Sequence, residues 1–328
     1  MTRQPLAAPI SGWITDAVGL VWLSGADRLS FLHRMSTNRV ADLAVGEGRS
    51  TVLVSDAGRV VDVVGCHHAV GGTVLVTSAP AAAPVVAAHL SRYTLRDDVR
   101  VTDATGQVVV RRVVGDRAIA MVERLVGAIP VPPTGAFVDH GEGAASIWAL
   151  RHTAPWPDSG WDIVMPAAAS SEPFDRAGIT TGVEPLSAGD YAMLRIRHRL
   201  PAFGAEIDGT ANPLELGLIR QIDFGKGCYI GQEIVARLDT YQKVQRRLVT
   251  LHGDAPMSVG DVVHPKGVPP TSRRRDGLGR ITSVASDGDG SLALAIVPSA
   301  WLNLSSTALE IGDDQPVRLL DASDESRG

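Results

Sequence analysis

The sequence predicts an α+β fold that ends in a small all-β segment. Two β-branched runs, Ser50–Val54 and Arg59–Val64, flank the turn residues 55–58, which is a hairpin signal. Apolar residues recur at helical spacing in the segment that follows Ser24. Because the chain lacks the regular strand–helix–strand alternation of a doubly wound sheet, these features favour the α+β class.

The elements after this hairpin follow in the same irregular order. Residues 78–93 predict a helix capped by Ser78. The runs Val99–Thr102 and Val108–Val114 predict a further pair of strands. The segment 127–182 is rich in proline and glycine, and its tryptophans favour packed structure over a linker.

From residue 244 onward, short apolar runs alternate with turn residues, which predicts a small β-barrel or sandwich. We therefore divide the chain into a region 1–243, with two α+β subdomains, and a C-terminal β domain 244–328. The predicted strands are Leu248–Leu251, Asp261–Val263, Ile281–Val284, Leu292–Val297 and Val317–Leu320.

Composition excludes several classes of protein. With 45% hydrophobic residues and a net charge of −5, the chain does not fit intrinsic disorder. No apolar run approaches the roughly 20 residues of a membrane span. The N-terminus lacks the pattern of a signal peptide, so we expect a cytoplasmic protein. Two cysteines exclude a disulfide framework and an all-cysteine iron–sulfur cluster, which takes about four cysteine ligands.

The most informative stretch runs from Asp223 to Glu233, DFGKGCYIGQE, and places a cysteine between glycines. A short helix is expected to begin near Gly231. Its N-terminus and Lys226 would both favour the thiolate of Cys228, which is the reactive form. The residues alone leave a buried, inert cysteine equally open. Glu233 fits a helix-capping role better than a general base.

Cys66-His67-His68 invites a metal-site interpretation, which the spacing does not support. In a strand, only Cys66 and His68 would face the same side, and no second ligand pair is visible. We therefore predict no metal site.

The net charge conceals a basic segment. Residues 191–250 hold nine Lys/Arg and six Asp/Glu, a balance of +3. Arg195 lies near Phe203 in this segment, and Arg237 follows the cysteine motif. The segment is either a solvated basic face or a surface that steers an anionic ligand or the phosphate backbone of RNA.

The run KGCYxGQE at Lys226–Glu233 resembles the signature of the YgfZ family, relatives of the glycine-cleavage T-protein, an aminomethyltransferase. Further resemblance lies at Leu23–Leu32, at Ser55-x-x-Gly58-Arg59 and from Leu194 to Glu215. It implies a GcvT/YgfZ-like ring architecture for binding tetrahydrofolate, closed by a C-terminal β-barrel. It also implies a role in the assembly or repair of iron–sulfur proteins, with client proteins or assembly factors as partners.

The resemblance and the residue chemistry together give the candidate site. Cys228, Lys226 and Asp62 are the candidate catalytic residues. The candidates for binding tetrahydrofolate or a related folate are Tyr229, Gln232, Glu233, Arg237, Arg195, Phe203 and Glu206.

Two departures from the T-protein pattern keep the reaction open. Only Asp62 remains of a paired aspartate, and Arg197 stands where the T-proteins carry a pterin-binding glutamate. A guanidinium offers only donors, whereas a carboxylate accepts hydrogen bonds. The alternatives to the iron–sulfur role are a folate-dependent aminomethyltransferase or demethylase that uses Asp62, and a non-catalytic adaptor or RNA-modification partner.

Overall fold

The computed structural model describes residues 11–15, 17–128, 137–140, 147–152, 160–241, 244–267, 278–286, 290–302, 309–312 and 315–320. The chain divides into two compact units. The first comprises residues 1–53, 61–190 and 220–229, and the second comprises 54–60, 191–219 and 230–328. The division predicted at residue 243 stays a prediction.

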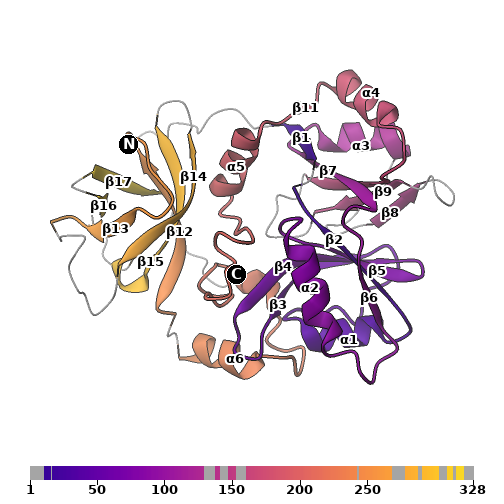
Figure 1. Ribbon diagram of the computed structural model, residues 1–328, viewed down its shortest axis with the longest axis horizontal. Helices are drawn as coiled ribbons and strands as arrows, with labels where there is room; N and C mark the ends of the chain where they lie inside the picture. The colour runs from indigo at the N-terminus through magenta and orange to yellow at the C-terminus, as the bar shows by residue number, and fades with distance from the viewer. Residues whose placement is uncertain are drawn as a thin grey trace. The chain divides into compact units, whose positions relative to one another are not determined.

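The first unit contains two β-sheets, one of six strands and one of five (Figure 1). The six-stranded sheet has the order β11-β1-β7-β10-β9-β8, and the five-stranded sheet has the order β3-β4-β5-β2-β6. The strands are β1 (Gly12–Thr15), β2 (Leu20–Ser24), β3 (Gly48–Val54), β4 (Val60–Ala69), β5 (Gly72–Val76), β6 (Arg100–Asp103), β7 (Val108–Val114), β8 (Phe137–His140), β9 (Ile147–Arg151), β10 (Trp161–Pro166) and β11 (Glu184–Pro185).

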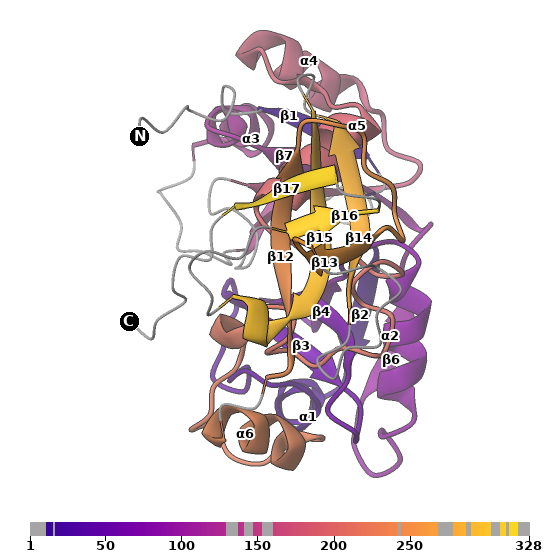
Figure 2. The ribbon, with the colours of Figure 1, turned by 90° about the vertical axis from the view of Figure 1, so that its left-hand side faces the viewer.

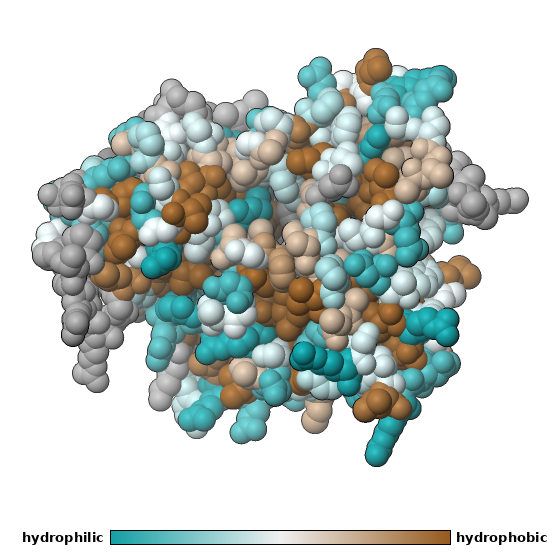
Figure 3. All heavy atoms as spheres, in the orientation of Figure 1, coloured by the Kyte–Doolittle hydropathy of each residue, from teal (hydrophilic) through white to brown (hydrophobic). Residues whose placement is uncertain are grey.

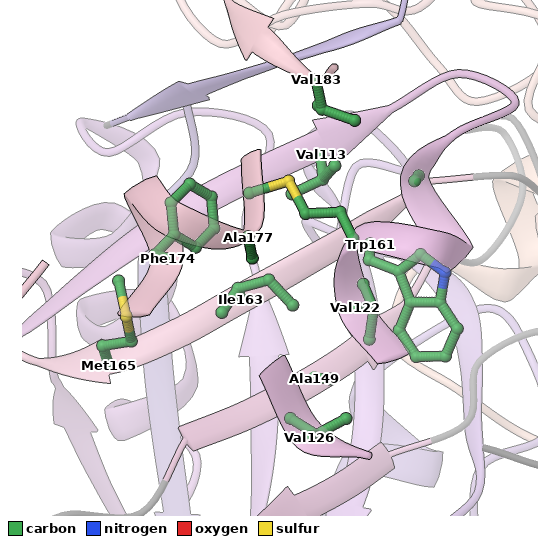
Figure 4. Close-up of a cluster of buried hydrophobic side chains, with 12 residues drawn as sticks. Val113, Val122, Val126, Ala149, Trp161, Ile163, Met165, Phe174, Ala177 and Val183 are labelled. Atoms are coloured by element: carbon green, nitrogen blue, oxygen red, sulfur yellow. The ribbon is translucent and has the colours of Figure 1, made fainter. Parts of the chain in front are cut away.

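Helices accompany both sheets of this unit. They are α1 (Arg28–Met35), α2 (Ala82–Ser91), α3 (Ala118–Val126) and α4 (Glu172–Thr181), with the 3-10 helix η2 (Ile219–Gln221) before the cysteine motif. Helices α3 and α4 pack on the six-stranded sheet, where Trp161, Ile163 and Phe174 are buried in one apolar cluster (Figure 4). This burial confirms the packed alternative for the tryptophan-rich segment at Trp161. Trp156 lies outside the described residues.

The two sheets share a second apolar cluster. Leu20 and Val74 of the five-stranded sheet pack there with Val110 and Leu150 of the six-stranded sheet. The rings of Trp22 and Trp148 are stacked beside this cluster, with centroids 5.7 Å apart. Two packed sheets need apolar residues on the faces that meet, and the residues of this cluster supply them from both sheets.

The second unit contains the closed six-stranded barrel β12-β15-β14-β13-β16-β17 (Figure 2). The predicted C-terminal barrel is thereby confirmed, although β16 escaped prediction because it has only three residues. Helices α5 (Ala188–Arg197) and α6 (Gln232–Thr240) precede the barrel in the chain. The strands are β12 (Arg246–Gly253), β13 (Val262–Pro265), β14 (Gly279–Ser286), β15 (Ser291–Pro298), β16 (Leu309–Ile311) and β17 (Gln315–Leu320), with the 3-10 helix η3 (Ser299–Trp301) after β15.

Local sequence signals predicted the β3–β4 hairpin correctly but not the start of helix α2. The predicted hairpin is formed by β3 and β4, and Gly58 adopts a positive φ of 66° in its turn. The predicted cap of α2 is wrong, because α2 begins at Ala82 and Ser78 instead binds a carboxylate on β4. Hydrogen bonding to a buried acid therefore takes precedence over capping at Ser78.

Within the described residues, no helix combines the length and the apolar character needed to cross a bilayer. Hydrophilic and apolar residues are interspersed over the face drawn in Figure 3.

An ionic cluster lies inside the six-stranded sheet. Arg112 on β7 donates two hydrogen bonds to Asp162 on β10, at 2.7 and 2.8 Å, and both residues are buried. The Nε2 atom of His152 lies 3.4 Å from the same carboxylate. Burial by itself would raise the pKa of Asp162, but the charge of Arg112 holds that pKa well below its usual range.

We expect Asp162→Asn to lower the free energy of unfolding by about 3 kcal/mol, because it removes the charge of the carboxylate that the buried Arg112 binds. Urea denaturation followed by circular dichroism measures this. Glu172→Gln is the control, since its pair with Arg176 is exposed on α4 and should change stability by less than about 0.5 kcal/mol. A loss below about 1 kcal/mol for Asp162→Asn would contradict the prediction.

Candidate functional site

The loop 223–229 carries the cysteine motif and begins shortly after η2, which ends at Gln221. Its first turn is closed by Asp223, whose Oδ1 atom accepts a hydrogen bond of 2.8 Å from the N–H of Gly225. Gly227 adopts a φ of 101°, a backbone conformation that side chains with a Cβ rarely take. The glycines of the motif therefore allow the chain to turn sharply on either side of Lys226.

The Lys226 side chain points into the first unit and is buried. Its Nζ atom donates hydrogen bonds to three main-chain carbonyls, those of His33, Ser36 and Asn38, the last at 2.9 Å. An ammonium group has three N–H donors, so all of them are used. Burial lowers the pKa of Lys226 to about 8.

The three carbonyls lie at and just beyond the C-terminal end of α1, where helical carbonyls lack partners within the helix. A cation at this end also complements the helix dipole. Lys226 thus caps α1 from a distant part of the chain, since 190 residues separate it from Ser36. This contact fixes the loop 223–229 against α1.

His33 provides a reciprocal contact at the same helix end. Its Nδ1 atom lies 3.4 Å from the N–H of Val40, which makes it the acceptor, so Nε2 carries the proton. Nε2 then donates to the carbonyl of Lys226 over 3.2 Å. Partial burial, followed by the charge of Lys226, lowers the pKa of His33, which favours this neutral ring.

The residues after α1 hold the beginning of the loop. The N–H of Asp223 donates to the carbonyl of Thr37 over 3.0 Å, and the Thr37 hydroxyl donates to the carbonyl of Gln221 over 2.6 Å. Arg39 donates to the Asp223 carboxylate over 3.0 Å, and this hydrogen bond lowers the pKa of Asp223. Both ends of the segment 221–226 are therefore bound to residues 33–39.

Tyr229 lies three residues after Lys226 and is buried. The Lys226 Nζ atom lies 5.2 Å from the centre of its ring, within range of a cation–π interaction. Burial raises the pKa of the phenol to about 12, so it stays protonated. Its hydroxyl is buried without a hydrogen-bond partner among the described residues. Such an atom can bind a polar ligand or an ordered water, and the folate contact at Tyr229 stays a prediction.

The two cysteines differ in accessibility. Cys228 is exposed on the loop, whereas Cys66 is fully buried in β4, where burial raises the pKa of its thiol to about 12. Only Cys228 is open to a partner or a reagent. Because its three N–H groups bind carbonyls, Lys226 positions the loop that carries Cys228.

Asp62 lies on β4 with no exposed surface. Its two carboxylate oxygens accept hydrogen bonds from the N–H and the hydroxyl of Ser78, at 3.0 and 2.5 Å. Burial nevertheless raises the pKa of Asp62 to about 7. The value suits a proton-transfer group, but the side chain is closed off from solvent.

In the second unit, two of the residues that we predicted to bind folate form a contact with each other. Arg195 on α5 donates to Glu206 over 2.9 Å and also to the hydroxyl of Ser283 on β14. That hydroxyl donates to the other oxygen of Glu206 over 2.6 Å. A register shift in β14 between Ile281 and Ser283 accompanies this contact. The network ties α5 to the barrel, and Phe203 lies half-buried in the connecting loop.

The remaining candidates lie on α6 of the second unit, which begins as predicted just after Gly231. A Cβ atom at Gly231 would approach the carbonyl oxygen of Ser55 to 2.4 Å, so only glycine fits there. Glu233 is exposed in the first turn, where a carboxylate stabilises the helix dipole. Gln232 is half-buried and Arg237 is exposed.

The described residues contain no group of three or more His, Cys, Asp or Glu side chains placed to hold a metal ion. Sequence reasoning missed His33 and the carbonyls at the end of α1. Main-chain acceptors carry no residue signature, so only the three-dimensional fold could reveal them.

Residues 15–226 match the model of the family described as the GCVT N-terminal domain, which is more than half of the chain. The chain belongs to the GCVT N-terminal domain family. This confirms the expected relation to aminomethyltransferases. The match ends at Lys226, before Cys228, so the YgfZ resemblance stays a prediction.

Two curated relatives and one solved structure are similar to this chain. The chain is 26% identical over 302 residues to a chloroplastic protein of Arabidopsis thaliana, covering 90% of this chain and 67% of that protein. It is also 26% identical over 305 residues to an aminomethyltransferase of Herpetosiphon aurantiacus, covering 90% and 81%. The glycine cleavage system aminomethyltransferase T of Bartonella henselae matches with a TM-score of 0.78 at 18% identity, over 95% of this chain and 86% of that one. The last match confirms the predicted GcvT-like fold.

The pKa of Asp62 predicts a pH dependence of stability. Between about pH 4 and pH 7 the folded state holds a proton that the unfolded state has lost, so the free energy of unfolding falls as pH rises through this window. Relative to Asp62→Asn, the native protein should lose at most about 4 kcal/mol from pH 4 to pH 8 and stay level above that.

Denaturation in urea at several pH values measures this difference. Asp56→Asn, in the exposed turn of the β3–β4 hairpin, is the control and should stay within about 0.5 kcal/mol of the native protein at each pH. A difference between the native protein and Asp62→Asn that does not change with pH would contradict the raised pKa.

Proposed function

We propose that the protein is a cytoplasmic, tetrahydrofolate-binding member of the GCVT N-terminal domain family that supports the assembly or repair of iron–sulfur proteins through Cys228. The observation that carries this proposal is the contrast between two candidate groups. The thiol of Cys228 is exposed on a loop that Lys226 pins to α1, whereas the carboxylate of Asp62 is fully buried and bound to Ser78.

A thiolate is both a nucleophile and a ligand for iron, so an accessible cysteine suits work on iron–sulfur clients. With two cysteines, one of them buried, the chain offers one thiol to a client protein and does not hold a cluster by itself. The hydrogen bonds of Lys226 favour binding of a client protein at Cys228. A loop that is already ordered before binding loses less conformational entropy when it binds.

Tetrahydrofolate would supply a carrier of one-carbon units when bound. The buried hydroxyl of Tyr229 supports binding, since it is a protonated donor without a partner among the described residues. Arg237 is exposed on α6, where it is suited to pair with the carboxylates of a glutamate tail.

Deletion of the gene in the source organism should lower the activity of iron–sulfur enzymes under oxidative stress, and the native gene should restore it. We expect Cys228→Ala to fail to restore activity, because it removes the only exposed thiol among the described residues. Cys66→Ala is the matched control, and it should restore activity once both variants are shown to accumulate equally. Full rescue by Cys228→Ala would contradict the proposal.

A second candidate is folate-dependent one-carbon transfer, and the pKa of about 7 at Asp62 favours it. Turnover of an aminomethyl donor with tetrahydrofolate that is lost in Asp62→Asn would support this candidate over the iron–sulfur role. Calorimetry with tetrahydrofolate tests the shared requirement of both candidates. Absence of saturable binding would contradict both.

A further inference from the structure

His33 is a titratable group among the contacts that hold the cysteine loop 223–229. It lies in the last turn of α1 and is half-buried, so solvent protons can reach its ring. Its side chain donates to the carbonyl of Lys226, and its own carbonyl accepts a hydrogen bond from the Lys226 ammonium group. The histidine and the loop are therefore linked in both directions, and a change in the charge of the ring acts directly on the loop.

Only the neutral ring of His33 fits these contacts. Nδ1 lies 3.4 Å from the backbone nitrogen of Val40 and accepts its N–H, while Nε2 lies 3.2 Å from the Lys226 carbonyl oxygen and donates to it. A protonated imidazole carries a hydrogen on both nitrogens and has no acceptor left. Protonation therefore brings two donors together at Val40. Because Val40 is fully buried, its N–H is then left without an acceptor.

The charges around His33 also oppose a second positive charge. Lys226 faces the ring from the loop, and Arg39 and Asp42 face it from the segment that follows α1. Burial of part of the ring, followed by the charge of Lys226, lowers the pKa of His33. The charge of Arg39 lowers this pKa further, whereas the hydrogen bond to the Lys226 carbonyl and the charge of Asp42 oppose the shift. The geometry and the local charge thus select the same neutral form.

We propose that His33 is a positioning residue for the cysteine loop and acts as a pH-sensitive switch: the neutral ring holds residues 223–229 on α1, and protonation of the ring releases them. The switch rests on the proposed function in one respect, because it regulates that function only if Cys228 is the working group. A released loop has to be ordered again when it binds a client protein, so acid should weaken the work of Cys228.

Linkage between protonation and release gives the sign and the size of the effect. The pKa of His33 is lowered from its usual value of 6.5 while the loop is held, and it returns toward that value when the loop is released. Protons therefore favour the released state below about pH 6.5. Because one proton is involved, the equilibrium for release shifts by at most about tenfold for each pH unit. It levels off once the ring is protonated in the held state as well.

Amide hydrogen exchange of the full chain from pH 7.5 to pH 5, corrected for the intrinsic exchange rate at each pH, measures release of the loop. We expect the corrected exchange of residues 223–229 to rise below about pH 6.5, by up to about tenfold per pH unit. Helix α2 is the internal reference for opening of the whole unit, and its corrected exchange should not rise. Asp223 stays charged over this range, because its hydrogen bond with Arg39 lowers its pKa.

His33→Gln removes the titration but retains an amide donor and a carbonyl acceptor. The corrected exchange of its loop should therefore not change with pH over this range, even if the loop is held less well than in the native protein. His252→Gln replaces a half-buried histidine on β12 of the second unit and is the matched control, which should keep the native pH profile.

A loop exchange that does not change with pH in the native protein would overturn the switch, whether or not His33→Gln folds. A native pH profile in His33→Gln would overturn it too. Neither result touches the proposed function, because no client protein takes part in the measurement. Full rescue by Cys228→Ala in the gene-deletion test would instead remove the function and leave the pH response of the loop intact.

Discussion

The ammonium group of Lys226 is the contact on which the candidate site depends. It binds three main-chain carbonyls at the end of α1, which satisfies acceptors that the helix leaves open and holds a glycine-rich loop in one conformation. Lysine suits this position because its three donors diverge from a single atom, whereas a planar guanidinium could not serve three carbonyls arranged around a point. His33 and Thr37 bind the same loop from the same helix end, so the contact is part of a small network.

The two candidate reactive residues, Cys228 and Asp62, differ in their exposure to solvent. The loop directs Lys226 and Tyr229 inward and leaves Cys228 exposed, while Asp62 is enclosed in β4 and bound to Ser78. The enclosed carboxylate and the exposed thiol are the basis of our proposal that Cys228 is the working group. The pKa of about 7 at Asp62 keeps proton transfer as the competing interpretation.

Much of this fold followed from local sequence signals, and much of the site did not. The β3–β4 hairpin, the start of α6 near Gly231 and the C-terminal barrel are encoded by turn residues and short apolar runs, which act locally. The partners of Lys226 are carbonyls 188 to 193 residues away, and no side-chain pattern marks them. Arg195 and Glu206 were predicted to bind a ligand, and in the structure they form an ion pair with each other. Their spacing in the sequence does not show that the fold brings these two opposite charges together.

The most direct test of this account is amide hydrogen exchange, compared by mass spectrometry between the native protein and Lys226→Met. The account predicts that exchange accelerates together in residues 33–40 and 223–229, while α2 exchanges as before, because both segments are held by the one ammonium group. Unchanged exchange in both segments would contradict the claim that Lys226 holds the cysteine loop in place.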